Sequence, residues 1–432
     1  MDRKWIINSD RWYSFLIALF LIYANYNAII THIISNKGGN AILLLLLAFS
    51  TIPYILNGGR QNRKNVSVLC IWMFFIFLIL MNRNKDIEYH RLHHVARVVT
   101  ATAILFMAQY GSGWAEKVPQ KIVKIGFLNI LATYFFLLIP PAYHIMVNFY
   151  GSAPVGTDHG MSGYHAGIAN HYSQNGTYIS FVFIVLAAVW IFQKTEGRKS
   201  DLKLTVLCII SLFALILTGK RGHFLFSIIA LVIVYFVANP KQMSGRAFKI
   251  IVVLAAGFAA LYISSFFVKP IAVLLQRFST AGSDAQSEAR FDMWALAWEH
   301  FKRHPILGIG WGGFKYQYSV TLYKDWLGEE YMYLNAHNVY VQLLCESGIV
   351  GFTTYLIGFL AVLKRTFNGL LKRKDLSLDA RKVLYVSLAG QIFILIYNMT
   401  GNALYDFCMF FYAIMASAAL CVLRSGGKRE IA

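Results

Sequence analysis

Residues 175–193 read NGTYISFVFIVLAAVWIFQ, nineteen residues without a charged side chain. A helix of this length spans about 28 Å at 1.5 Å per residue, which matches the hydrocarbon core of a bilayer. Backbone polar groups in hydrocarbon must hydrogen bond internally, so such a stretch is predicted to be a transmembrane helix.

Similar apolar blocks recur along the whole chain. Hydrophobic residues make up 57% of the 432 residues and charged residues only 14%, which excludes an ordinary soluble domain. Twelve blocks are predicted to be helices: 12–34, 41–57, 66–81, 95–110, 122–145, 175–193, 204–218, 223–238, 248–268, 339–363, 383–398 and 404–423. The predicted fold is all-α, a polytopic membrane protein with about twelve transmembrane helices.

The net charge of +20 would suit a nucleic-acid partner, but its distribution indicates topology instead. Seven alternate connecting or terminal segments hold 26 of the 40 Lys and Arg residues: 1–11, 58–65, 111–124, 194–203, 239–249, 364–382 and 424–432. By the positive-inside rule these segments and both termini are expected in the cytoplasm. The basic segment 82–97 departs from the alternation and is expected on the outer side, where it could form an interfacial helix.

The largest polar piece, 269–336, is too long for a bare connection and is expected to fold over the outer membrane surface. Residues 283–305 predict a helix that Ser283 or Asp284 caps and Pro305 ends. A stripe of large and small apolar residues along it could face lipid or other helices: Phe291, Trp294, Ala295, Trp298 and Phe301. The chain is therefore divided into helices one to nine (1–268), an outer loop region (269–338) and helices ten to twelve with a short tail (339–432).

Cysteines and histidines give little sign of a metal or disulfide. All five cysteines fall in predicted helices, and no CxxC pattern occurs. The clusters His159/His165/His171 and His90/His93/His94 lack carboxylate or thiolate companions at ligand spacing, apart from Asp158. We therefore expect no metal and no cofactor.

Residues 336–351, AHNVYVQLLCESGIVG, carry the main chemical signal. His337 is expected at the water–lipid boundary, where an imidazole can accept a proton from a hydroxyl. A simpler interpretation is a residue that caps the helix, and Asn338 fits an N-cap equally well. Glu346 lies too far along the helix to orient His337 directly and is expected to form a polar contact between helices. Gly348 and Gly351 are expected to permit close helix approach.

Cations at the outer face are the second signal. Lys220 and Arg221 stand in a turn between two apolar helices, where ionisable groups are either functional or extend to lipid headgroups. Arg290, on the predicted loop helix, and Arg277 are candidate anion ligands, with solvated surface pairing as the alternative. Since the sequence holds no Asp-x-Asp pair, arginines are expected to neutralise any diphosphate.

These residues resemble the signature of bacterial lipopolysaccharide O-antigen ligases, members of the O-antigen polymerase/ligase superfamily. His337–Asn338, nine intervening residues and Gly348-Ile-Val-Gly351 match its histidine motif, and Arg221 with Leu225 matches its Arg-x-x-x-Leu element. Arg290 and the PILGIGWGGF stretch at 305–314 resemble the region just before the histidine. Helix number and loop position agree over essentially the whole length, as in GT-C-type glycosyltransferases.

The resemblance implies a glycosyltransferase of the bacterial inner membrane with a periplasmic active site. Its donor would be O-antigen on undecaprenyl diphosphate, and its acceptor the lipid A–core oligosaccharide. His337 would be the general base, Arg221 and Arg290 would stabilise the diphosphate, and Lys220, Arg277 and Asn338 would contact substrate. The resemblance further implies metal-independent displacement with inversion.

Three alternatives stay open at this point. An O-antigen polymerase would use a second lipid-linked glycan as acceptor, and a protein O-oligosaccharyltransferase shares the histidine pattern. A polyprenyl-glycan transporter would need charges through several helices. The helix interiors are instead almost free of charge, with Glu346 and Asp406 the main exceptions.

Overall fold

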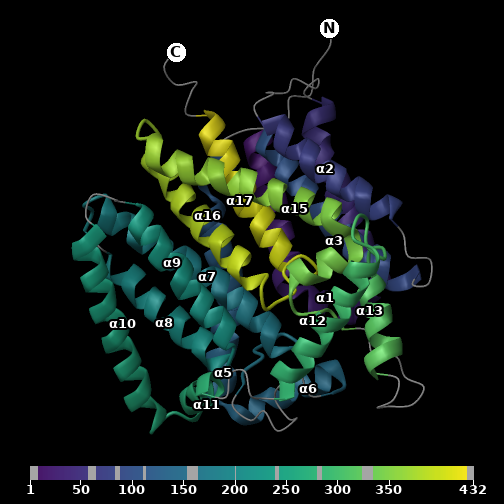
Figure 1. Cartoon of the computed structure of the whole chain (residues 1–432). Coiled ribbons are helices and arrows are strands. Elements are labelled where there is room, and N and C mark those ends of the chain that lie inside the picture. The colour runs from purple at the N-terminus through teal and green to yellow at the C-terminus, as the bar shows by residue number, and fades with distance from the viewer. Residues whose placement is uncertain are drawn as a thin grey trace.

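The computed structural model describes residues 8–56, 65–82, 88–109, 113–152, 164–199, 201–238, 243–279, 285–323 and 334–425. Within these ranges the secondary structure is helical and includes no strand (Figure 1). The elements in chain order are α1 Ser9–Leu56, α2 Val66–Met81, α3 Glu88–Phe106, η2 Met107–Gln109, α4 Gly113–Glu116, α5 Val118–Leu138, η3 Pro140–Tyr143, α6 His144–Tyr150, α7 Tyr172–Thr195, α8 Leu202–Leu217, α9 Arg221–Val237, α10 Met243–Ser265, α11 Lys269–Ser279, α12 Ala285–Arg303, α13 Gly313–Tyr318, the π-helical turn η5 Ser319–Tyr323, α15 Val339–Lys372, α16 Leu378–Tyr397 and α17 Cys408–Ser425.

Each of the twelve apolar blocks overlaps helical structure, which confirms an all-α protein of the multi-pass membrane class. Within the described ranges, five helices are long and apolar enough to cross a bilayer: α1, α5, α7, α15 and α16. Shorter apolar helices account for further blocks, so the total of twelve spans stays a prediction. Blocks 12–34 and 41–57 are joined in α1, whose backbone leaves helical geometry at Tyr26 and Ser35.

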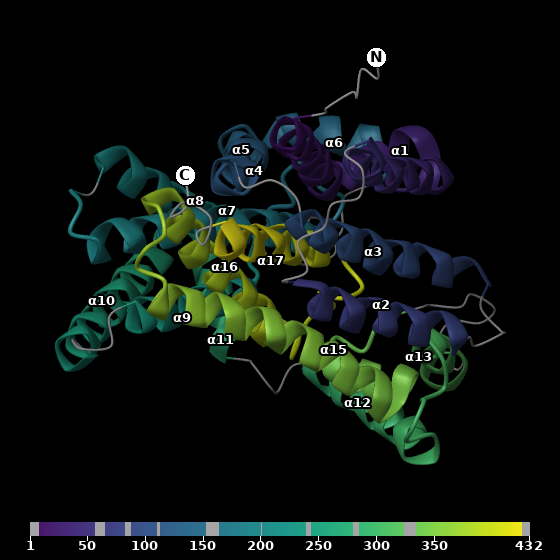
Figure 2. The same cartoon turned by 90° about the horizontal axis from the view of Figure 1, so that it is seen from above.

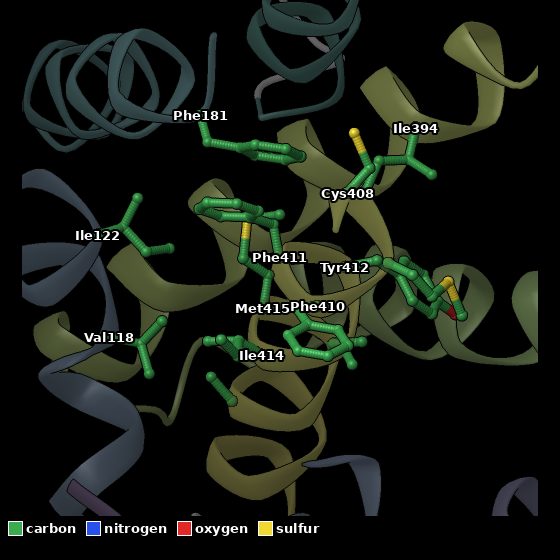
Figure 3. Packing of buried hydrophobic residues seen from close by; sticks show 14 of the residues in the cluster. Val118, Ile122, Phe181, Ile394, Cys408, Phe410, Phe411, Tyr412, Ile414 and Met415 are labelled. Atoms are coloured by element: carbon green, nitrogen blue, oxygen red, sulfur yellow. The ribbon is translucent and has the colours of Figure 1, made fainter. Parts of the chain in front are cut away.

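Helix α17 lies in the centre of the molecule, packed against α16, α3 and α15. Its sequence is apolar all round, the pattern of a helix that contacts protein on every side. Aromatic side chains fill the space around it. The rings of Phe181 and Phe411 stack at 4.3 Å (Figure 3), and those of Phe359 and Tyr412 stack at 4.5 Å. Helices α1 and α5 pack side by side over this centre (Figure 2).

The outward faces of several helices expose large apolar side chains. Examples are Phe15 and Leu44 on α1, Phe77 on α2, Leu131 on α5 and Phe258 on α10. So many exposed apolar residues would be unfavourable in water and suit contact with lipid.

Both described ends of the chain lie at the same pole, around α4. Asp10 accepts hydrogen bonds from the backbone of Gly113 (2.9 Å) and Trp114 (3.3 Å), and Arg424 donates to the carbonyl of Gln109. Nearby, Arg381 at the start of α16 pairs with Glu196 at the end of α7 (2.6 Å). Segments expected in one compartment from their charge are thus gathered at one pole, which we call the basic pole.

Between residues 269 and 336 the described chain forms α11, α12, α13 and η5. Helix α12 matches the predicted loop helix, while Ser283 and Asp284 lie outside the described residues. The apolar stripe predicted for α12 differs in part from the face that packs against the protein. Phe291 and Trp298 of the stripe are about half exposed, while Met293 and Ala297 are buried. The packing of α12 against α15 selects a face centred on Met293 and Ala297.

Candidate functional site

The segment after α12 is inserted into a break in α15. The backbone of α15 leaves helical geometry at Gly348 (φ 59°, ψ −167°), which frees backbone groups on both sides of the break. Ile309 and Gly310 donate to the carbonyls of Cys345 and Glu346, both at 2.9 Å, and the carbonyl of Pro305 accepts from Ile349 at 2.8 Å. This interlock pairs backbone groups that the break leaves without helical partners.

Glycines make the interlock possible. A Cβ on Gly348 would overlap the backbone of Ile306, and its positive φ also disfavours other residues. A Cβ on Gly308 would lie 2.5 Å from the Cys345 carbonyl oxygen. Gly348 therefore permits the close approach of a loop rather than of a second helix. A Cβ on Gly351 would overlap the Ser347 side chain.

His337 lies just before α15 with a backbone φ of 53°, a conformation uncommon for residues other than glycine. Its neighbours hold it there. The backbone N–H of Ala336 donates to Gln342 Oε1 (3.0 Å), and Trp294 Nε1 donates to the Ala336 carbonyl (2.8 Å). The backbone N–H of Val339 donates to the carbonyl of Asn398 (2.8 Å), so His337 is fixed between α12, α15 and the α16–α17 connection.

A buried polar network supports this arrangement from within α15. Gln342 Nε2 donates to Glu346 Oε1 (3.0 Å), and the Tyr405 hydroxyl donates to Glu346 Oε2 (2.8 Å). Glu346 thus contacts the α16–α17 connection through Tyr405, whereas a contact with a second helix was expected. Through Gln342 it also fixes the backbone immediately before His337.

Asn338 is the N-cap of α15. Its Oδ1 accepts from the backbone N–H of Tyr340 (3.1 Å) and Val341 (3.2 Å), which satisfies two of the unpaired donors of the first turn. This geometry gives Asn338 a capping contact, the alternative that its sequence position also suggested.

The imidazole of His337 lies in an enclosed and electropositive environment. Burial, and then the charges of Arg290, Lys220 and His171, lower its pKa from the usual 6.5 to about 3. The ring is therefore neutral at physiological pH, as a proton acceptor must be. The charges of Arg290, on α12, and of Lys220, in the α8–α9 turn, therefore both act on the His337 imidazole.

Arg290 reaches this site because of its position on α12. It precedes Trp294 by four residues, so both side chains lie on one face of the helix. Since Trp294 is hydrogen-bonded to Ala336, that face is turned toward His337.

The α8–α9 turn contributes Lys220 and Arg221. Lys220 Nζ lies 4.7 Å from the centre of the Tyr172 ring, and Arg221 is the first residue of α9 and half-buried. Leu225, the partner of Arg221 in the Arg-x-x-x-Leu element, is partly exposed on the next turn. Arg277 belongs to α11 by its backbone, but its side chain lies outside the described residues.

His171 is a site residue that sequence reasoning considered only as a metal ligand. It caps α7 by accepting from the backbone N–H of Ser173 at Nδ1 (2.9 Å), and its ring stacks on Tyr172. Burial and the charge of Lys220 lower its pKa to about 4. The end of the Gly/His-rich segment thus packs beside Lys220 and His337.

Asn402 is a second residue that the motif search missed. Its Nδ2 lies 3.3 Å from His337 Nδ1, while its Oδ1 is buried and makes no hydrogen bond within the described part of the chain. Its position in the short uncharged segment 398–403 on the predicted outer side was the available signal.

No group of three or more His, Cys, Asp or Glu side chains with metal-ligand geometry occurs among the described residues. His159 and the side chains of His90, His93 and His94 lie outside them.

The family model described as O-antigen ligase matches residues 206–356. This range contains Lys220, Arg221, Arg290, His337 and the interlock at Gly348. No curated protein sequence matches the chain.

Proposed function

We propose that this chain, which belongs to the O-antigen ligase family through residues 206–356, transfers O-antigen from undecaprenyl diphosphate to lipid A–core. The observation that carries the proposal is the half-buried His337, held at a positive φ by its neighbours with Nδ1 3.3 Å from Asn402, where the charges of Arg290 and Lys220 act on it. A proton acceptor beside fixed cations suits attack by a hydroxyl group on a sugar bound to an anionic leaving group.

The cations bind the donor diphosphate. Arg290 and Arg221 supply planar forks that pair with phosphate oxygens, and Lys220 adds a compact charge. The charge on the leaving diphosphate grows as the glycosidic bond breaks. Cations held by α9 and α12 therefore stabilise the transition state more than the ground state.

His337 activates the acceptor. Its imidazole takes the proton of the acceptor hydroxyl while the oxygen attacks the anomeric carbon and the bond to the diphosphate oxygen breaks. The lipid diphosphate leaves with the bonding electrons, and a single displacement inverts the anomeric centre. No ATP is required, because the lipid diphosphate is already an activated leaving group.

Asn402 selects the tautomer that this step needs. A 180° turn of its amide directs the unpartnered Oδ1 at Nδ1, so that Nδ1 carries the hydrogen and Nε2 keeps its lone pair. This arrangement gives Oδ1 a partner, moves the NH₂ group to the position that Oδ1 leaves, and keeps Nε2 free to take the proton from the acceptor hydroxyl.

Replacement of His337 by Asn tests the base. Asn tolerates a positive φ better than Ala, so H337N keeps the backbone while removing the imidazole. We expect H337N to lose about 10²–10⁴-fold in turnover of purified undecaprenyl-diphosphate glycan. The exposed His304, replaced in H304N, is the matched control and should leave turnover unchanged. Near-normal turnover by H337N would contradict the assignment.

The acceptor is decided by competition. Reconstituted protein receives donor together with lipid A–core and a second lipid-linked glycan, and we expect the lipid A–core product. Extension of the second glycan instead would identify a polymerase with the same site.

A further inference from the structure

A cavity of about 340 Å³ lies between α15 and α17 at the basic pole. Roughly 40 Å of helix separates its first α15 residue, Arg365, from His337, so it is distinct from the catalytic site. It is lined by two asparagines, two leucines, a glycine and four cations: Asn65, Asn368, Leu420, Leu423, Gly369, Arg365, Lys372, Arg373 and Arg424.

The lining is rich in donors, and no carboxylate belongs to it among the described residues. Arg365 donates to Asn65 Oδ1 (3.0 Å), so the NH₂ group of the same amide points away from Arg365. That nitrogen is buried and has no acceptor within the described residues. Arg373 is paired with Asp375 outside the lining at 2.6 Å. A buried donor without an acceptor, surrounded by cations, indicates an anionic ligand.

The floor of the cavity is apolar. A Cβ on Gly369 would overlap Leu423, so this glycine lets α15 and α17 approach closely. Arg365, Asn368, Gly369 and Lys372 follow helical spacing along one face of α15, above Leu420 and Leu423 of α17. A cationic rim over an apolar floor suits a phosphate group attached to an apolar body.

We propose that this cavity binds the phosphate group of an anionic phospholipid of the phosphatidylglycerol or cardiolipin class. Basic pockets between transmembrane helices are suited to such headgroups, and the basic pole is the one that charge distribution assigns to the cytoplasm. The volume falls in the lower part of the ~300–1,000 Å³ range of small-ligand sites, larger than one phosphate requires.

Two neighbouring lysines give a matched test. Lys372 lines the cavity, whereas Lys374 does not, and both are exposed. The full chain is purified in neutral detergent, and bound phosphatidylglycerol is measured by native mass spectrometry. K372E should weaken retention by about fivefold or more, while K374E should retain lipid like the wild type. Equal losses in both variants would overturn the proposal, because they would indicate general attraction to a basic surface.

A second pair guards against loss of folding. R365Q removes a cavity cation that also holds Asn65, and K364Q removes the same charge from the adjacent position outside the cavity. We expect R365Q to lower the retention of phosphatidylglycerol and K364Q to leave it unchanged. K372E should fold normally. In the third part of the experiment, inorganic phosphate replaces the lipid as the ligand. If phosphate binds with the same sensitivity to K372E and phosphatidylglycerol does not, the ligand is a soluble phosphate and the lipid assignment is wrong.

Discussion

At the scale of single residues, His337 combines an uncommon backbone conformation with an enclosed ring. Ala336 on one side and Val339 on the other are held by hydrogen bonds, so the positive φ is maintained by its surroundings. Such residues concentrate at functional sites, where surrounding structure supports an unfavourable conformation.

The low pKa of His337 predicts an unusual pH profile. Since the free protein holds this pKa at about 3, the acidic limb of kcat/KM should lie well below the ordinary 6.5. The acidic limb of the kcat profile should lie at a higher pH than that of kcat/KM. The reason is that a bound diphosphate offsets the cations that lower the pKa of His337. Removal of one cation in K220M should raise the limb of kcat/KM, since a neighbouring positive charge disfavours imidazolium. Rate measurements from about pH 2 to 8 check this. A limb near 6.5 that K220M leaves in place would contradict it.

Asn402 is predicted to position the base. N402L removes the hydrogen bond to Nδ1, and we expect kcat to fall by about 10- to 100-fold with little change in donor KM, since a positioned base contributes about 10²–10⁴-fold. N402D supplies a carboxylate that accepts from Nδ1–H, so it should restore much of kcat and move the acidic limb upward. A purely structural role for Asn402 would give neither rescue nor a shifted limb.

At the scale of elements, the break in α15 connects the glycine motif to His337, the proposed base. The short helical piece from Val339 to Ser347 carries Gln342 and Glu346, which fix Ala336. The interlock with Pro305–Gly310 anchors the same piece to the end of α12, the helix that carries Arg290. Base and cation are thus positioned by one connected unit.

Substitution of Gly348 tests this unit. G348A introduces a Cβ that overlaps Ile306 at a positive φ, and we expect about 1–3 kcal/mol of destabilisation together with reduced turnover. Gly257 is the control, because it is exposed in α10 and a Cβ there meets nothing within 4 Å. G257A should be neutral or slightly stabilising. Thermal unfolding in detergent gives the comparison, and equal melting temperatures for G348A and wild type would count against the interlock.

At the scale of the whole molecule, helix positions could be predicted because lipid imposes length and composition on each span. Candidate site residues could be named from the sequence, because His337 and Arg290 belong to motifs readable along the chain. The interlock could not be predicted, because the helical pattern runs unbroken through Gly348. The segment that holds Asn402 was visible in the sequence, but its partner was not, since the contact with His337 spans 65 residues.

The structure adds two buried or partly buried cations to the charges that the sequence interpretation singled out. The helix interiors were expected to hold little charge beyond Glu346 and Asp406. In the structure, Arg97 Nη1 donates to the Tyr405 carbonyl (2.5 Å), and its guanidinium lies over the Phe407 ring, where the charge of Asp406 acts on it. Lys315 is buried and interacts with Glu346. Opposite charges that meet only after folding cannot be read from hydropathy.

The charge of Glu346, in α15, acts on Lys315, in α13, and we expect the two residues to be energetically coupled. Burial lowers the pKa of Lys315 to about 8, and the Glu346 carboxylate opposes that shift. K315M leaves that carboxylate without its cation, and E346Q leaves a buried ammonium without its anion, so each single change should destabilise by about 3–5 kcal/mol. The double variant should lose clearly less free energy of unfolding than the sum of the two single losses, because it leaves neither charge uncompensated.

An exposed ion pair on α12, Lys302 and Glu299 at 2.5 Å, is the control. The effects of K302M and E299Q on stability should be additive, because water screens this pair. Unfolding measured for both cycles in the same detergent decides the matter, since additivity at Lys315 and Glu346 would mean that loop and core are held together by the backbone interlock alone.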